Sequence, residues 1–264
     1  MKDLKIRTLT AIAILAIFLG IFQLGSQLST LWMACITGLI LYELYKGFQN
    51  IDITINFPLL ITIFTLMTVN SFLHFTCRDI FIIGVLMIFV YYIFDEHEAR
   101  LKNMMATLFV STYVLFMGQP LYLYSPDNIK KYYLIFAITI GTDVFAYLGG
   151  MIFGRHKLAP KISPKKTIEG AVVGILGGLL LGCSVLYFQG ILDFSTLDIK
   201  LILFVILASI AAELGDLFAS RLKRNFGIKD FANLLPGHGG VLDRFDGVLF
   251  VCLVIHLFYT GVCI

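Results

Sequence analysis

Charged residues are scarce in this sequence of 264 residues. Asp, Glu, Lys and Arg together make up only 14% of it, whereas soluble domains carry about 25%. Hydrophobic residues make up 59%. So few charges cannot cover the surface of a water-soluble globule, and so much apolar mass exceeds what one soluble core can bury. Most of the surface is therefore expected to face lipid.

Several common chemical signatures are also missing. The five cysteines lie in or beside apolar runs and form no CxxC pair, which argues against a zinc site and favours small buried side chains. The sequence contains no GxxxxGK[ST] P-loop, no HExxH zinc motif and no GxSxG nucleophile motif. No repeat with a period of about 20–50 residues is visible, which excludes a solenoid. His74 and His256 each stand alone and are interpreted as structural.

Long hydrophobic runs are abundant. A helix that crosses a membrane needs about 20 mostly apolar residues. The first run follows Lys2, Lys5 and Arg7 like a signal peptide, but a second run follows almost at once and no cleavage site stands out, so we interpret it as a retained span. The predicted spans lie near residues 8–26, 28–45, 54–70, 78–94, 104–121, 132–153, 168–188, 200–219 and 244–263. The sequence thus predicts an all-α, polytopic integral membrane protein with about nine transmembrane helices.

Lys and Arg are distributed unevenly over the loops between these spans. With the N-terminus in the cytoplasm, 16 of the 20 basic residues fall on the cytoplasmic side and 4 on the other side. This split agrees with the rule that cytoplasmic loops are rich in Lys and Arg. The two longest basic loops, 154–167 and 220–240, then share the cytoplasmic face. We expect a multi-pass protein of the cell (inner or plasma) membrane, with its N-terminus and its active site facing the cytoplasm.

Acidic residues within the spans gather in the second half of the chain. In the first half, Glu43 and Asp79 lie near span ends, where snorkelling or an interfacial position explains them. The acids of the second half, in or at the head of spans six, eight and nine, are Asp143, Glu213, Asp216, Asp243 and Asp246. The last four form two pairs with a spacing of three residues, which places each pair on one helix face. One such acid can be a structural ion pair, for example Asp216 with Arg244, but ion pairs alone do not require five.

The types of residue in this region indicate a chemistry. An ionisable group inside a membrane span marks a functional site by default. Clustered carboxylates without Cys or His partners suit a hard cation such as Mg²⁺. Lysines and arginines suit polyanions, and Gly and Pro let a backbone turn tightly and approach a phosphate. Together these features predict phosphoryl or nucleotidyl transfer at the cytoplasmic lipid interface.

The segment 220–247 reads SRLKRNFGIKDFANLLPGHGGVLDRFDG. It resembles the signature of the CDP-diacylglycerol synthases, also called phosphatidate cytidylyltransferases. The matching positions are Ser220, Lys223, Arg224, Lys229, Asp230, His238, Gly239, Gly240, Asp243, Arg244 and Asp246. The run GRHKLAPKISPKKTIEG at 154–170 is similar to a second segment of that family. The resemblance covers roughly residues 142–247, whereas the first 130 residues agree only in being hydrophobic.

The resemblance implies a reaction and roles for these residues. CTP and phosphatidate would give CDP-diacylglycerol and pyrophosphate, through in-line attack of the lipid phosphate on the α-phosphorus. One or two Mg²⁺ ions would be held mainly by Asp216 and Asp243, with Asp246, Asp143 and Glu213 as further ligands or supports. The expected catalytic residues are Asp216, Asp243, Asp246 and Lys223. The expected substrate contacts are Lys165, Lys166, Ser220, Arg224, His238 and Arg244.

Several alternatives stay open for individual residues. The basic residues can be plain positive-inside charges. Ser163 and Thr167 can donate to phosphate or can cap the seventh span. His238 can orient a phosphate or a metal-bound water, or can simply serve the loop. Whether a general base is used is also open.

The expected partners are CTP, phosphatidate and the lipid bilayer, without nucleic acid, and a homodimer is left open. We expect residues 1–130 to form an N-terminal membrane region of about five helices, and residues 131–264 to form a catalytic region of about four helices with two basic loops. One alternative function is a CTP-dependent polyprenol or lipid kinase, which would release CDP instead of pyrophosphate. A second is a cation-coupled transporter, but the internal repeat common in transporters is not found.

Overall fold

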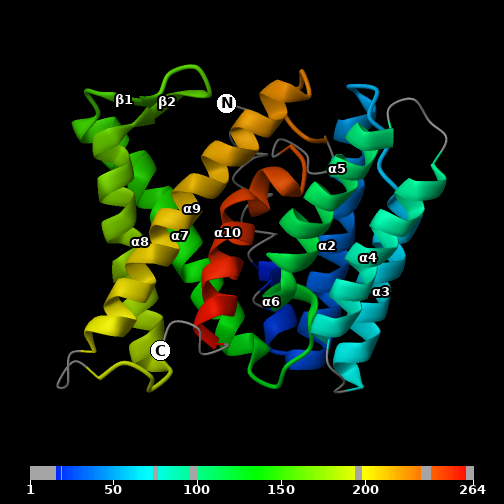
Figure 1. Cartoon of the computed structure of the whole chain (residues 1–264). Coiled ribbons are helices and arrows are strands. Elements are labelled where there is room, and N and C mark those ends of the chain that lie inside the picture. The colour runs from blue at the N-terminus through cyan, green and yellow to red at the C-terminus, as the bar shows by residue number, and fades with distance from the viewer. Residues whose placement is uncertain are drawn as a thin grey trace. The chain divides into compact units, whose positions relative to one another are not determined.

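Figure 1 presents a computed structural model of the chain, which describes residues 16–18, 20–73, 77–95, 100–193, 198–232 and 239–259. The chain divides into two compact units. The first unit combines Met1–Ile129 with Asn225–Asp243, and the second combines Lys130–Arg224 with Arg244–Ile264. The boundary that the sequence predicts after residue 130 lies next to Ile129, where the long segment Met1–Ile129 of the first unit ends. The described residues of Asn225–Asp243 belong to the first compact unit. The boundary at residue 130 stays a prediction.

The first unit consists of helices that follow one another closely in the chain. They are α2 (Ser26–Gln49), α3 (Phe57–Phe72), α4 (Cys77–Phe94), α5 (Arg100–Val110), the π-helix η1 (Ser111–Phe116) and α6 (Gln119–Tyr122). The start of α3 is fixed by its sequence, because the side chain of Asn56 accepts the N–H of Leu59 at 3.1 Å and Pro58 lies in the first turn. The core of the first unit lies along α2, where Ile40, Leu41 and Leu44 are fully buried.

One predicted span of the first unit is not a single helix. The run predicted at 104–121 is divided into α5, η1 and α6. The π-helical turn of Ser111–Phe116 interrupts the regular hydrogen-bond ladder, and Pro120 lies in the first turn of α6. Hydropathy does not register such a turn, because every residue in it can remain apolar.

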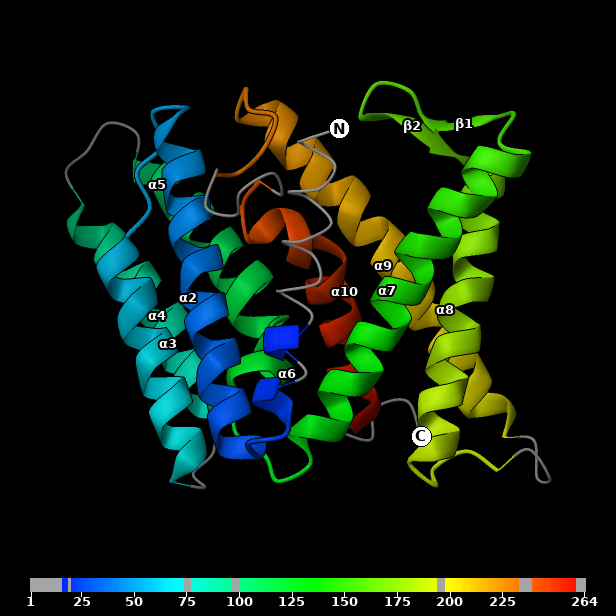
Figure 2. The same cartoon turned by 180° about the vertical axis from the view of Figure 1, so that it is seen from behind.

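The second unit contains three long helices, a hairpin and the last helix. Its elements are α7 (Asn128–Phe153), β1 (Lys157–Ala159), β2 (Ser163–Thr167), α8 (Ile168–Phe188), α9 (Ile199–Asn225) and α10 (Leu242–Tyr259). The two strands are antiparallel, with Lys157 opposite Thr167 and Ala159 opposite Ser163. This hairpin is drawn beside the labels β1 and β2 in Figure 2. The sequence predicted only a basic loop there.

Small residues bring α7 and α8 together. A Cβ atom added to Gly141 of α7 would lie 2.8 Å from the carbonyl oxygen of Gly177 on α8, so the two backbones meet there without side chains between them. At the start of α8, the hydroxyl of Thr167 accepts the N–H of Gly170 at 3.2 Å. Thr167 is therefore the N-cap of the helix, as one of the two alternatives for this residue expected.

Among the residues that the structure describes, five helices are long and apolar enough to cross a membrane, and α3 is a shorter apolar helix. The five are Ser26–Gln49, Cys77–Phe94, Asn128–Phe153, Ile168–Phe188 and Ile199–Asn225. On α4, only Gly84 and Ile88 are buried, which leaves an apolar surface suited to lipid. The predicted all-α membrane class is thus confirmed. The count of nine stays a prediction, since most of the first predicted span lies outside the described residues.

Candidate active site

Lys166 lies at the centre of the site in the second unit. Its ammonium nitrogen is 2.6 Å from Oε2 of Glu213 and 2.8 Å from Oδ2 of Asp216. The lysine lies on β2 and both acids lie on α9, so the ion pairs connect the hairpin to the helix. The spacing of three residues does place the two carboxylates on one face, as the sequence predicted. Because the side chain of Lys166 is only 19% exposed and that of Glu213 only 8%, water screens their ion pair weakly.

The protonation of Lys166 is settled by its neighbours. Burial disfavours the charged form and by itself lowers the pKa of this ammonium group. Asp216 and Glu213 act in the opposite direction, through their charges and their hydrogen bonds, and they prevail. The net effect raises the pKa of Lys166 above its usual value, so the group carries its full charge at neutral pH.

Glu213 also has an oxygen that Lys166 does not reach. Its Oε1 atom is buried and has no hydrogen-bond partner among the residues that the structure describes. A Cβ atom added to Gly174 of α8 would lie 2.9 Å from this oxygen, so the glycine leaves room for the carboxylate. A buried, unsatisfied carboxylate oxygen is unfavourable, and such an atom calls for an explanation.

Two more predicted acids act on the same group of charges. Asp143 of α7 is exposed, and Asp246 of α10 is half-buried. The electrostatic partners of Asp143 are Asp216, Lys166, Glu213 and Arg244. Those of Asp246 include Asp216, Asp143 and Lys223. We call Asp143, Lys166, Glu213, Asp216 and Asp246 the acid–lysine cluster. The structure thus brings together four of the five predicted acids with three of the predicted basic residues.

The remaining predicted residues of the second unit surround this cluster. The hydroxyl of Ser220 donates to Oδ1 of Asp216 at 3.3 Å, one turn further along α9. Lys165 is exposed, because neighbouring residues of a strand point to opposite faces and Lys166 takes the inner one. Lys223 and Arg224 lie in the last turn of α9, where basic residues also favour the helix dipole.

Asp243 belongs to the first unit. There it organises the end of the segment 220–247, which we call the signature segment. Its Oδ2 atom accepts the backbone N–H of Phe231 and that of Gly240, both at 2.9 Å. Gly239 adopts a φ of 80°, a conformation that favours glycine. His238 lies outside the described residues. Asp216 and Asp243 fall in different units, so their joint binding of a metal stays a prediction.

The cluster suits a hard cation by its chemistry. The carboxylates of Glu213 and Asp216 meet at Lys166, and one buried oxygen of Glu213 lacks a partner among the described residues. Within that same part of the chain, no three His, Cys, Asp or Glu side chains are already arranged to hold a metal ion. Lys166 instead neutralises Glu213 and Asp216. Binding of Mg²⁺ stays a prediction.

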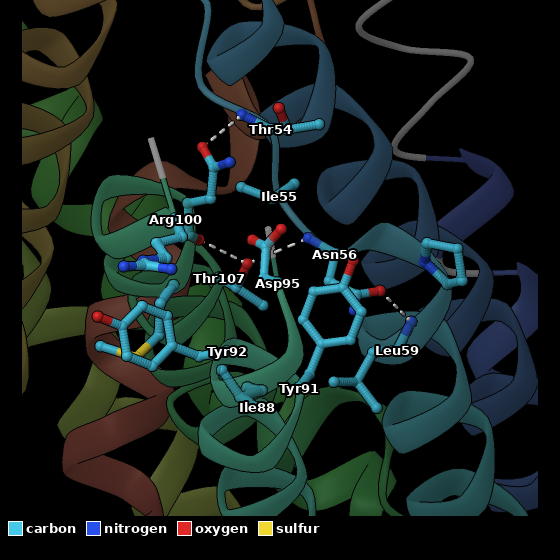
Figure 3. A pocket seen from close by; sticks show the side chains of 13 residues that line it. Thr54, Ile55, Asn56, Leu59, Ile88, Tyr91, Tyr92, Asp95, Arg100 and Thr107 are labelled. Carbon is cyan, nitrogen blue, oxygen red and sulfur yellow. Dashed lines mark hydrogen bonds between the residues drawn. The ribbon is translucent and has the colours of Figure 1, made fainter. Parts of the chain in front are cut away.

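The first unit contains a pocket of about 200 Å³ that none of the predicted site residues lines (Figure 3). Its polar groups connect helices. The backbone N–H of Thr54 donates to Oδ1 of Asn103 at 3.0 Å, and that of Asn56 donates to Oγ1 of Thr107 at 3.1 Å. These bonds tie the segment before α3 to α5, which accounts for the polar lining in structural terms.

Glu43 is the residue that the sequence analysis misjudged. An interfacial position was expected, but the residue is only 1% exposed and accepts two backbone N–H groups at the start of α10. The interfacial interpretation is therefore wrong for Glu43. The side chain of Asp79 is 62% exposed beside Arg78, and its interfacial position stays a prediction. The only sequence signal for Glu43 was an acid in an otherwise apolar helix.

Comparison with known proteins shows which family this chain belongs to. The model of the "Cytidylyltransferase family" matches residues 5–262. A phosphatidate cytidylyltransferase of Staphylococcus haemolyticus is 33% identical over 260 residues, which is 96% of this chain and 98% of the relative. Proteins of the same name from Staphylococcus saprophyticus and Staphylococcus aureus (strain COL) are 30% and 33% identical, each over 96% of this chain and 98% of the relative. The resemblance seen in the sequence is thus confirmed, and the chain belongs to the cytidylyltransferase family.

Proposed function

We propose that this protein is a phosphatidate cytidylyltransferase of phospholipid biosynthesis, which converts CTP and phosphatidate into CDP-diacylglycerol and pyrophosphate. The names of its relatives, which match over 96% of the chain, support this function. The observation that carries it is the acid–lysine cluster, in which Lys166 contacts Glu213 and Asp216 within a group of helices apolar enough to span a membrane. A site for a lipid headgroup and a nucleotide needs both kinds of charge at such a place.

The basic residues have a clear task in this reaction. Both substrates are polyanions and repel each other. Lys166 is charged and partly buried, so in the complex it can exchange its carboxylate partners for phosphate oxygens. Lys165, Lys223 and Arg224 add positive charge on the hairpin and on the end of α9. Attraction of this kind is worth more in a weakly hydrated site than in water.

The acids fit the binding of one or two Mg²⁺ ions. The candidates to hold them in the second unit are Asp216, Glu213, Asp143 and Asp246. Asp243 of the first unit is a candidate ligand by the family resemblance alone. When bound, Mg²⁺ supplies positive charge that offsets the charge of the reacting phosphates and of the leaving pyrophosphate. Ser220 keeps Asp216 oriented through the hydrogen bond between its hydroxyl and Oδ1 of that residue.

The reaction itself is a displacement at phosphorus. An oxygen of the phosphatidate phosphate forms a bond to the α-phosphorus of CTP, and the bond from this phosphorus to the β-phosphate oxygen breaks. Pyrophosphate leaves with the electron pair. The protein's contribution is mainly positioning and electrostatic stabilisation, because the reacting groups bring their own nucleophile and leaving group.

The location of the reaction follows from the charge pattern. The chain is a multi-pass membrane protein by its apolar helices. The excess of Lys and Arg in loops 154–167 and 220–240 favours a cytoplasmic active site in the cell membrane. CTP is then available from the cytoplasm and phosphatidate from the inner leaflet.

The decisive experiment uses the purified full chain in lipid nanodiscs with phosphatidate, Mg²⁺ and CTP labelled in the cytosine ring. We expect a lipid-soluble cytidine product together with one pyrophosphate per product. Labelled CDP with a phosphorylated lipid would instead indicate the lipid-kinase alternative. Ion uptake into liposomes without any CTP requirement would indicate the transporter. Either result would overturn the proposal.

A further inference from the structure

Glu43 binds the start of a helix that is almost two hundred residues away in the chain. Its Oε1 atom accepts the N–H of Val241 and its Oε2 atom accepts the N–H of Leu242, both at 2.7 Å. Such N–H groups at a helix start have no partner within their own helix. A carboxylate from α2 therefore caps α10, with each oxygen used once and the side chain only 1% exposed.

The carboxylate of Glu43 also leaves no room for a side chain at Gly240. A Cβ atom added to Gly240 would lie 2.8 Å from both carboxylate oxygens of Glu43 and 2.9 Å from the backbone nitrogen of Ala232. Gly240 in turn donates its N–H to Oδ2 of Asp243. Glu43 and Asp243 thus hold the same turn through different N–H groups, although their like charges repel each other. The requirement for glycine at position 240 follows from Glu43 together with the backbone of Ala232.

The same face of α2 holds the beginning of the signature segment. Glu43 and Gly47 are four residues apart and lie on one face of α2, and Phe48 follows directly after Gly47. The rings of Phe48 and Phe226 have centroids 4.9 Å apart, and a Cβ atom added to Gly47 would lie 2.6 Å from the ring of Phe226. The segment Asn225–Asp243 is therefore fixed to α2 at its beginning and at its end.

We propose that Glu43 is a positioning residue, which holds the turn 240–242 so that Asp243 is presented in its working orientation. The proposal rests on the proposed function for its catalytic part. An apolar side chain could dock a helix without burying a charge. A carboxylate is suited to the particular task of fixing two N–H groups, because charge-assisted hydrogen bonds are short and directional.

The first test measures how much Mg²⁺ the enzyme needs. In Glu43→Gln, one oxygen acceptor becomes an NH₂ group that faces an N–H donor, so the turn can no longer be held at both points. We expect the half-saturating Mg²⁺ concentration of the cytidylyl transfer to rise about 10-fold or more, which is typical when a group that orients a metal ligand is lost. Asp79→Asn is the matched control, because it removes an exposed acid from another helix of the same unit, and we expect no change.

The second test does not depend on activity. Hydrogen exchange followed by mass spectrometry reports on the amides of Val241 and Leu242 through a peptide covering residues 239–249. We expect these amides to exchange about 10-fold faster in Glu43→Gln than in the parent protein or in Asp79→Asn, since two charge-assisted bonds are lost or weakened. Peptides from α8 should exchange at the parent rate, which separates a local release of the turn from general destabilisation.

Gly240→Ala provides a second variant with the carboxylate intact. Its Cβ atom would displace the turn from Glu43, so we expect the same two changes. A loss of folded protein in Glu43→Gln with an unchanged Mg²⁺ requirement and unchanged local exchange would show a merely structural role and overturn the inference. If even the parent protein forms no cytidine lipid, the proposed function fails, while hydrogen exchange still decides whether Glu43 holds the turn.

Discussion

At the scale of single residues, the site is a balance of opposite charges. Lys166 satisfies one oxygen of Glu213 and one of Asp216. Removal of the lysine leaves two carboxylates close together without a counter-charge, and removal of one acid leaves the lysine with a single strong partner. We therefore expect the residues of this cluster to influence both folding and catalysis, and each substitution must be assessed by both measurements.

Lys166→Met is the clearest substitution in the cluster. We expect cytidylyl transfer to fall about 100-fold or more, because the charge facing the phosphates is lost. We also expect stability to fall by at most about 3 kcal/mol, below the value for a fully buried pair, because Asp216 is part-exposed. Initial rates and thermal unfolding in the same nanodiscs check these values. Lys161→Met, an exposed position of the same hairpin connection, should retain activity within about 2-fold.

Asp243→Asn separates structure from catalysis at the signature segment. One Oδ2 atom accepts both N–H groups, and the carbonyl oxygen of asparagine can take over both bonds. We therefore expect a folded, inserted protein whose activity falls about 100-fold or more, because the negative charge for the metal is gone. Activity and unfolding temperature are the two measurements. A variant with near-parent activity would rule out Asp243 as a metal ligand.

The sequence was informative about which residues carry charge at the site and less so about what holds them. Asp143, Lys166, Glu213, Asp216 and Asp246 were all expected in the site, and they interact in the structure. Acids in apolar spans stand out because each is unfavourable there. The role of Glu43 did not stand out, because its partners are backbone N–H groups 198 and 199 residues away. Because almost every residue has a backbone N–H group, the residue types in a sequence do not show which of these groups an acid will bind.

At the scale of elements, hydropathy found the helices better than their ends. The span predicted at 200–219 corresponds to α9, which continues to Asn225. Hydropathy detects only the lipid-facing part, whereas the helix goes on into a polar region with Lys223 and Arg224 in its last turn. The hairpin of β1 and β2 was missed because its strands of three and five residues are too short and polar for a periodic signal.

The contact between α7 and α8 gives a prediction for helix packing. In Gly141→Ala, the new Cβ atom would lie 2.8 Å from the carbonyl oxygen of Gly177, so the helices must separate. We expect a loss of about 1–3 kcal/mol, as is typical of overpacking. Gly38→Ala is the matched control, since its nearest neighbour would be 3.9 Å away. Thermal unfolding of the two variants should differ, and equal unfolding temperatures would argue against close packing at Gly141.

At the scale of the whole molecule, the class of the protein was predictable from its composition, whereas its division at residue 130 stays a prediction. Composition alone required a lipid environment, and the family is confirmed by matches along 96% of the chain. The assignment of Asn225–Asp243 to the first unit was not foreseen. Sequence patterns predict regions that are contiguous in the chain. The contacts of Phe226 and of Val241 with α2 instead connect parts of the chain that are far apart in sequence.

Orientation in the membrane can be tested on the whole protein. Cysteine substituted for the exposed Lys161 should react with a membrane-impermeant maleimide only from the cytoplasmic side. Cysteine substituted for Asp127, in the connection between α6 and α7, should react only from the opposite side, because one spanning helix separates the two positions. Labelling of right-side-out and inverted vesicles gives the comparison. The reverse pattern would place the active site outside the cytoplasm.

The long separation between Glu43 and its two donors has a consequence for biosynthesis. A ribosome that adds about 5–20 residues per second releases Glu43 into the bilayer on the order of 10–40 s before Val241, which lies 198 residues later, exists at all. Throughout that interval the nascent chain carries an acid without its final donors. Any message that ends before codon 241 produces a protein that can never supply them, so we expect quality-control proteases to degrade such truncated products rather than let a stable amino-terminal half accumulate.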